Sequence, residues 1–422
     1  GIGIEMESDK PGWYDSLNGL PGIFGSSTCE TFELKRFMQY FKEALSKNPS
    51  ENVSLPEETA EFLIGLNKLL ALKLSDFDFW DKSSSLKEYY RSKVLMGISG
   101  AEKTFSAKEI IAFLDAGIKK INKGLSKAID PKSGLYFTYF RYEAVKYQPL
   151  SSKNAKGLPC VKILKFKRIP LALFLEGEVH YMKSEKNKDI VLEHIKKTRA
   201  SSLYDKKLGM FKVSSLLKDE SLEIGRTRVF LPGWLENESV FMHMSYKYLL
   251  EILKAGLYDE FFKEIKTGMV CFTDPKIYGR SILENSSFIC SSAFYDAKNH
   301  GRGFVARLSG SAAEFIDMWL RITAGEKPFS YENGKLSFEL KPIINSSFFD
   351  NDGKFSFNLF CKTQVTYINP SKKSTYSKDM RIKKLEIIWE DGKKQSVDGA
   401  VLYGQDAVKI RQVLAKEIKA YF

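Results

Sequence analysis

The sequence predicts a mainly α-helical protein, an incomplete toroid of paired helices, followed by a C-terminal β-sandwich. Through most of the chain up to Pro328, apolar residues recur every three or four positions, which is the spacing of one buried helix face. No Val-rich or Ile-rich strands alternate with these segments, as they do in a parallel α/β sheet. Beyond Pro328, short aromatic and β-branched runs are separated by Asn-Gly and Asp-Gly turns, which is typical of antiparallel strands.

Five helices follow from this spacing and from signals at helix ends. Residues 28–47 place their apolar side chains on one face, and residues 56–74 are apolar enough to bury more than one face. A capping box starts the third helix at Ser106, where a Ser and a Glu side chain bond the free amides of the first turn. Residues 242–255 and 311–324 each precede a glycine that can take the left-handed conformation of a helix C-cap.

The same patterns divide the chain into two domains. Residues 1–328 form the helical-barrel portion, with a β-rich insertion at about residues 135–175 where aromatic and β-branched residues concentrate. Residues 329–422 form the β-sandwich, which ends in a helix from about Gln405.

The composition is that of a folded chain, and the distribution of charged residues limits the classes of partner that we expect. Of the 422 residues, 43% are hydrophobic, which excludes disorder, and no apolar run reaches the ~20 residues of a membrane-spanning helix. The 65 Lys and Arg against 52 Asp and Glu give a net charge of +13, but lysines stand beside glutamates, as in Lys42-Glu43. We therefore interpret the charge as a solvated surface and expect neither nucleic acid nor a membrane as a partner.

The cysteines indicate a reducing compartment. All five lie far apart without a CxxC pair, a pattern that fits neither a disulfide framework nor a zinc site. We expect a cytoplasmic protein without metal or cofactor. The chain opens on Gly-Ile-Gly-Ile, without an initiator Met or a signal peptide, so we expect the true N-terminus to be missing.

The first candidate site is a glycine-rich loop at residues 12–22. It places the aromatic wall of Trp13 two residues before Asp15 and ahead of a helix. A sugar ring stacks on such a wall, and an apolar surround can raise the pKa of an Asp until it acts as a general acid. On these residues alone, a turn with an Asp cap is an equally good interpretation.

The second candidate site runs from Pro232 to His243. Glu236 and Asn237 are suited to hold sugar hydroxyls, and His243, at the start of a helix, is suited to bind an anion together with the free amides of that helix end. A lone histidine is more often structural, so the pattern by itself favours the structural alternative.

The third candidate site is the turn Ser309-Gly310-Ser311, which opens a helix. Its hydroxyls and amides suit phosphate oxygens, and Arg302 and Arg307 are nearby in the sequence as bidentate donors. The turn lacks the Lys and the spacing of a P-loop, and a well-capped helix explains it equally well.

Taken together and in this order, the three clusters resemble the cellobiose phosphorylase family of inverting glycoside phosphorylases. Trp13, Asp15 and Asn18 match the family's Trp-x-Asp-x-Leu-Asn stretch, which implies that Asp15 is the general acid and that Trp13 lines the donor-sugar site. Glu236 and Asn237 match an element whose Glu contacts the donor sugar and which leads, seven residues later, to a phosphate-binding His.

The phosphate turn of that family, Thr-Gly-x-Ala-Ala, corresponds to Ser309-Gly310-Ser311-Ala312-Ala313. The resemblance therefore implies a phosphate site at His243, Ser309 and Gly310. It also implies an N-terminal β-sandwich, an (α/α)6 barrel and a C-terminal β-sandwich, of which this chain would hold the later part of the barrel and the last domain. The front sandwich and the family's phosphate-binding Arg would precede it.

The chain departs from the family at several positions. Leu235 stands where members usually have Lys, Glu238-Ser239 where they have Gly-Gly, and the donor-site Gln has no clear match near Cys290. These departures suggest a divergent branch that acts on a longer β-glucan.

The resemblance implies phosphorolysis of a β-glucoside or β-glucan to an α-sugar 1-phosphate, with phosphate as co-substrate and no metal. Members are often dimeric, which makes a homodimer the assembly to test. Two alternatives stay open: an inverting hydrolase that uses Glu236 or Glu238 as base, and a noncatalytic carbohydrate-binding subunit or one half of a split enzyme.

Overall fold

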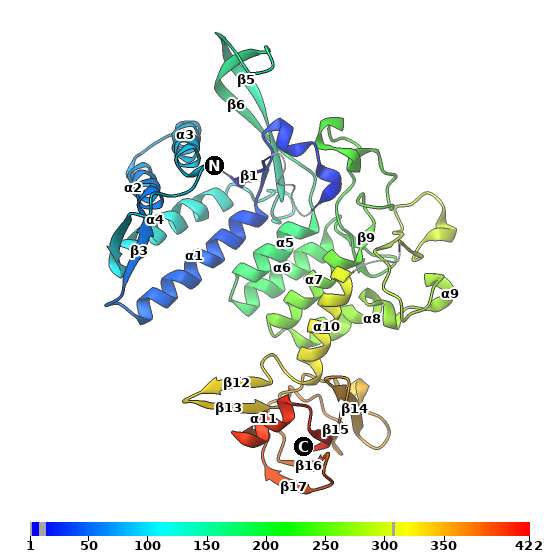
Figure 1. Cartoon of the computed structure of the whole chain (residues 1–422). Helices are drawn as coiled ribbons and strands as arrows, with labels where there is room; N and C mark the ends of the chain where they lie inside the picture. The colour runs from blue at the N-terminus through cyan, green and yellow to red at the C-terminus, as the bar shows by residue number, and fades with distance from the viewer. Residues whose placement is uncertain (1, 8–13, 306–308) are drawn as a thin grey trace. The chain divides into compact units, whose positions relative to one another are not determined.

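The computed structural model describes residues 2–7, 14–305 and 309–422 of the chain (Figure 1). Within these residues it mixes helices α1–α11 with strands β1–β19, most of them in antiparallel sheets, and no barrel of paired helices is closed. The prediction of a mainly α-helical toroid is therefore wrong. The physical reason is that short aromatic runs between the helices pair with one another over two residues each, a signal too short to recognise in the sequence.

The chain folds into two compact units, which are described separately. The first comprises residues 1–251, 274–281 and 286–305, and the second comprises residues 252–273, 282–285 and 306–422.

The first unit begins with a helical layer. Helix α1 (Cys29–Lys47) packs against α4 (Ala107–Leu125), and α2 (Glu57–Ala71) packs against α3 (Asp76–Val94) and α4. Strands β3 (Asn52–Pro56) and β4 (Glu102–Ser106) pair beside them. The capping box predicted at Ser106 is confirmed, and the apolar face of α4 supplies Ile110 and Leu114 to the buried core of this layer.

A long hairpin follows in the segment expected to be rich in strands. Strand β5 (Tyr139–Lys153) pairs with β6 (Pro159–Pro170), and its first residues also pair with β2 (Ser26–Ser27), which pairs with β1 (Ile4–Glu5). Figure 1 shows the hairpin extending outward from the helices. Only its base is buried, at Tyr139 and Phe140.

The remainder of the first unit carries short elements that position the candidate residues. They are α5 (Leu175–Ser184), α6 (Lys188–Ala200), β7 (Tyr204–Asp205), β8 (Met210–Phe211), β9 (Val240–Phe241), most of α7 (Met242–Lys254), α9 (Pro275–Tyr278), β10 (Phe288–Ile289) and β11 (Gly303–Phe304). Strand β10 lies between β9 and β11, and this small sheet leads directly into α7.

The second unit combines helices with two sheets. Its helices are α8 (Tyr258–Gly268), α10 (Ser309–Thr323) and α11 (Gln405–Arg411). The three-stranded sheet has the order β12 (Phe329–Glu332), β13 (Lys335–Glu339), β18 (Val401–Tyr403). The five-stranded sheet has the order β14 (Lys354–Leu359), β15 (Thr363–Ile368), β19 (Ala415–Tyr421), β16 (Lys384–Trp389), β17 (Lys394–Asp398).

The end of the chain differs from the prediction. A helix does start at Gln405, but it is only seven residues long, and the chain ends in β19 at the centre of the larger sheet. The buried residues Ile418 and Ala420 agree with this placement, because a spacing of two is the spacing of a strand with one covered face.

No helix among the described residues is both long enough and apolar enough to cross a membrane.

A tyrosine in the larger sheet holds the end of α10. The hydroxyl of Tyr367 donates to the carbonyl oxygen of Thr323 over 2.6 Å, and both residues are fully buried. We expect Tyr367→Phe to lower the free energy of unfolding by about 1–2 kcal/mol, because the Thr323 carbonyl is left without this bond. Urea unfolding measures the loss, and Tyr403→Phe, on an exposed side chain of β18, is the matched control. Equal stability of the two variants would contradict this role.

Candidate functional site

The loop that carries Asp15 is anchored by apolar side chains on either side of it. Tyr14, Leu17 and Leu20 are at most 2% exposed and pack in one cluster with Tyr139 and Phe174. The Tyr14 ring meets the Phe174 ring edge to face at 5.3 Å, and its hydroxyl donates to the carbonyl oxygen of Val213 over 3.1 Å. Asp15 itself begins a 3₁₀ turn with its side chain exposed. The carboxyl group is therefore presented to solvent from a rigid base; Trp13 lies outside the described residues.

A second loop is packed tightly against the first. Asn18 Oδ1 accepts a hydrogen bond from the amide of Arg226 over 3.2 Å, and the amide of Gly19 donates to Ile224 over 3.1 Å. Gly225 lies between these residues at φ 122°, and a Cβ there would come within 2.5 Å of Asn18 Oδ1. Only glycine fits this position, since both the conformation and the space exclude a side chain.

The Glu236-Asn237 turn has a strained backbone. Leu235 and Glu238, on either side of it, have φ of 50° and 56°, which is the left-handed region. Non-glycine residues held in this region cost of order 1–3 kcal/mol each and concentrate at functional sites. The turn is closed by Gly233, whose amide donates to the Asn237 carbonyl over 2.9 Å.

The side chain of Asn237 is used within this turn. Its Nδ2 donates to the Phe230 carbonyl over 2.7 Å, and its Oδ1 accepts from the Leu217 amide over 3.4 Å. The residue is 2% exposed. These bonds give Asn237 a positioning role for the turn, and its contact with a sugar stays a prediction.

The structure brings the Asp15 loop and the Glu236 turn together across 220 residues of sequence. The Ser16 hydroxyl donates to Glu236 Oε2. Burial raises the pKa of Glu236, and the negative charge of Asp15 adds to the rise, while hydrogen bonds from Ser16 and the charge of Arg226 act in the opposite direction. The charges of Asp15 and Arg226 therefore both act on the carboxyl group of Glu236.

Glu238 has a different environment from Glu236. Its carboxylate forms a buried ion pair with Lys212, with Nζ 2.6 Å from Oε1, and its amide donates to Ser214 Oγ over 3.2 Å. A carboxylate that is paired in this way with a cation is not free to act as a base.

The residues predicted to bind phosphate lie at two helix starts. His243 is the second residue of α7 and half-buried, and the preceding amide of Met242 donates to the Ser287 carbonyl over 2.9 Å. Ser309 and Gly310 are the first two residues of α10, in the second unit. Ser311 follows them fully buried, and its hydroxyl has no hydrogen-bond partner among the described residues. Arg307 lies outside those residues, and Arg302 is exposed.

The residues that the structure assembles are thus Asp15, Asn18, Glu236 and Asn237, all in the first unit. His243 belongs to the same unit, and Ser309 and Gly310 do not.

The sequence analysis missed three contributors to this assembly. Ser16 links the two loops, Gly225 permits their close approach, and Arg226 supplies a cation beside Glu236. No local pattern marks Arg226, because its hydrogen bond to Asn18 joins residues 208 positions apart and Glu236 comes close only through the fold of the turn. The Gly at 225 was the available signal, since a glycine beside a charged residue in a loop often marks close backbone contact.

One aromatic pocket lies apart from these residues. It has a volume of about 310 Å³ and is lined by, among others, Phe24, Phe77, Trp80 and Phe166, and none of the candidate residues lines it. It therefore adds nothing to the predicted site.

The contact between the two loops makes Gly225→Ala a sensitive substitution. We expect it to destabilise the protein by about 1–3 kcal/mol and to shift the Asp15 loop, because the new Cβ meets Asn18 and the φ is unfavourable. Gly334→Ala is the matched control: it has φ 77° but nothing within 4 Å of the added carbon. Urea unfolding compares the two, and an equal loss in both would show that the loops are not tightly packed.

The raised pKa of Glu236 predicts a pH dependence of stability. Because the folded state holds this proton more tightly than the unfolded chain, the stability of the wild-type protein falls as the pH rises from 4.5 through the raised pKa. Glu236→Gln removes this effect, so its melting temperature relative to wild type should rise between about pH 4 and about pH 7. Thermal unfolding across this range tests it; a difference that stays constant or shrinks would contradict the buried position of this carboxyl group.

Comparison with known proteins assigns no family: no protein-family model matches the chain, and no curated protein matches it.

Proposed function

We propose that the protein catalyses inverting phosphorolysis of a β-glucoside or β-glucan, which yields an α-sugar 1-phosphate. The observation that carries the proposal is the hydrogen bond between Ser16 and Glu236. It joins the loop that would hold the general acid to the turn that would hold the donor sugar. The resemblance requires these two segments to lie close together in space, although they are far apart in the sequence.

The backbone of the Glu236 turn adds independent support. Glu238 takes a left-handed φ of 56°, a conformation that favours glycine, where members of the resembled family have Gly. The conformation is thus one that a Gly-Gly pair would adopt without strain. In this chain the Glu238 side chain is held by its ion pair with Lys212.

The chemistry needs one acid and a bound nucleophile. Inverting hydrolysis requires a second carboxylate to deprotonate water, but phosphate is already an anion and needs no base. In the proposal, Asp15 protonates the glycosidic oxygen while phosphate attacks the anomeric carbon from the opposite side. His243, Ser309 and Gly310 would hold the phosphate, with hydrogen-bond donors and helix-end amides aimed at its oxygens.

An inverting hydrolase is the second candidate, and Glu236 favours it. This carboxyl group lies close enough to Asp15 for their charges to interact, and two carboxyl groups with room for a water between them are what inverting hydrolysis uses. Glu238 is excluded as the general base because its carboxylate is paired with Lys212.

We also propose a cytoplasmic location, because all five cysteines are free thiols. A homodimer remains an assembly to be tested by light scattering.

The role of Asp15 is tested with two leaving groups. We expect Asp15→Asn to lower kcat on a β-glucan by about 10²–10⁴-fold, the usual contribution of a general acid. On an aryl β-glucoside with a strongly acidic phenol the loss should be much smaller, because that leaving group departs without protonation. The melting temperature should not change, because the side chain is exposed. An equal loss on both substrates would show that Asp15 is not the acid.

The nucleophile is tested by product analysis with and without phosphate. We expect sugar 1-phosphate in phosphate buffer and no free sugar in its absence. Release of free sugar without phosphate, abolished by Glu236→Gln, would establish the hydrolase instead. Oligosaccharide binding without turnover in either buffer would indicate the noncatalytic alternative.

A further inference from the structure

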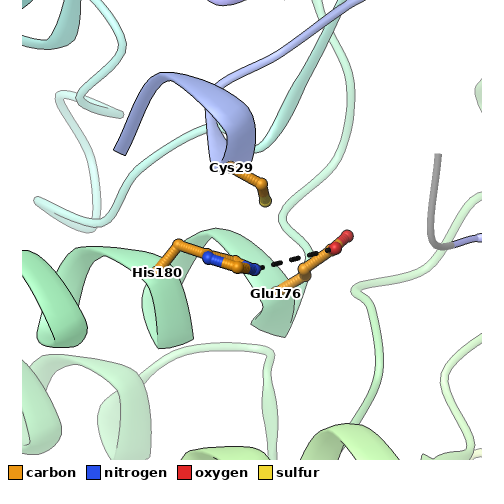
Figure 2. A group of neighbouring side chains, drawn as sticks. All are labelled: Cys29, Glu176 and His180. Atoms are coloured by element: carbon orange, nitrogen blue, oxygen red, sulfur yellow. Dashed lines mark ion pairs between the residues drawn. The ribbon is translucent and has the colours of Figure 1, made fainter. Parts of the chain in front are cut away.

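A second group of reactive side chains lies beneath the Asp15 loop, apart from the residues used above. Cys29, Glu176 and His180 offer a thiol sulfur, a carboxylate oxygen and an imidazole nitrogen that all lie within 4.8 Å of one another. Figure 2 shows the three side chains converging from the start of α1 and from α5. Cys29 and Glu176 are at most 4% exposed, and the His180 side chain is 12% exposed.

The imidazole is oriented as a metal ligand is. Glu33 Oε1 lies 2.6 Å from His180 Nδ1, so this nitrogen carries the proton and donates it. The other nitrogen, Nε2, faces Glu176, whose Oε1 lies 4.0 Å away, too far for a hydrogen bond. A metal-bound histidine usually donates the proton of one ring nitrogen to a carboxylate, while the lone pair of the other ring nitrogen points to the metal.

The carboxylate and the thiol are both buried. Glu176 Oε2 accepts a hydrogen bond from the Tyr139 hydroxyl, and the charges of His180 and Lys247 act on this carboxylate. Burial disfavours the charged form of each group. A divalent cation would favour the charged form of each, because one thiolate and one carboxylate balance its two charges.

Glu33 does not disturb this charge balance. Its carboxylate is paired with Arg36 and lies 3.6 Å from Lys183 Nζ, both outside the cluster. The net charge of a metal with Cys29, Glu176 and neutral His180 would be zero, which is the condition for a stable buried ion.

We propose that Cys29, Glu176 and His180 bind one Zn²⁺ ion. The combination of thiolate, imidazole and carboxylate is that of zinc, which takes three protein ligands and a water molecule at about 2.0–2.3 Å. Binding draws the donor atoms together by roughly 1 Å and releases the thiol proton. The ion joins the first residue of α1 to α5 beneath the Tyr14 anchor, so its effect is on stability, and the proposal stands whether or not the protein is a phosphorylase.

Metal analysis of the purified full chain tests the proposal. We expect about one zinc per chain in the wild-type protein, lost in Cys29→Ser and in His180→Gln. Cys290→Ala removes another buried thiol, far from these ligands in the sequence, and should keep the zinc. Glu33→Gln leaves all three ligands in place and should weaken zinc binding about 10–100-fold, because the carboxylate that orients the His180 ring is lost.

A spectroscopic readout covers the case in which a variant fails to fold. Wild-type protein loaded with Co²⁺ should show the thiolate-to-cobalt absorption band, and chelation should lower its melting temperature. Absence of bound zinc in the wild-type chain, absence of that band, or full zinc retention by Cys29→Ser would overturn the proposal.

Discussion

The burial of Tyr14, Leu17 and Leu20 is the constraint on which the candidate site depends. Each large side chain removed from water contributes about 1.5–3 kcal/mol, while a neutral hydrogen bond contributes about 1 kcal/mol. The apolar residues on both sides of Asp15 therefore decide where the loop lies. The polar contacts of Ser16 and Asn18 then decide how it is oriented toward the Glu236 turn.

The buried carboxylates of the first unit show how differently such groups are accommodated. Glu238 is paired with Lys212 at 2.6 Å, and Glu178 lies 2.5 Å from His194 Nε2. Glu236 has a hydroxyl donor and remains partly accessible. Glu176 has a phenol and a distant imidazole, and a thiol beside them. Glu176 differs from the other three because a thiol and an imidazole lie beside it, and these three groups together are suited to hold a cation.

Some helices were predicted from their apolar spacing, whereas α3, α5, α6 and α8 were missed. Helices α1 and α4 lie where the spacing and the capping box placed them. Helix α3 was missed because it buries none of its residues fully and has no continuous apolar stripe. The toroid was wrong for a related reason: ladders such as β9 with β10 form between segments about fifty residues apart, and each spans two residues.

The candidate site shows the same division between local and distant information. The sequence alone determined which residues have suitable chemistry, namely Asp15, Glu236, Asn237 and His243, because residue type and local spacing are written in the chain. Only the tertiary structure decided that Ser16 bonds Glu236, that Arg226 lies beside them and that Asn237 is bound to the backbone. It likewise brought Cys29 to Glu176 and His180, although the cysteines without CxxC spacing had argued against a metal. The reason is physical: contacts between residues 147 or 220 positions apart depend on how whole elements pack, and no local propensity encodes that packing.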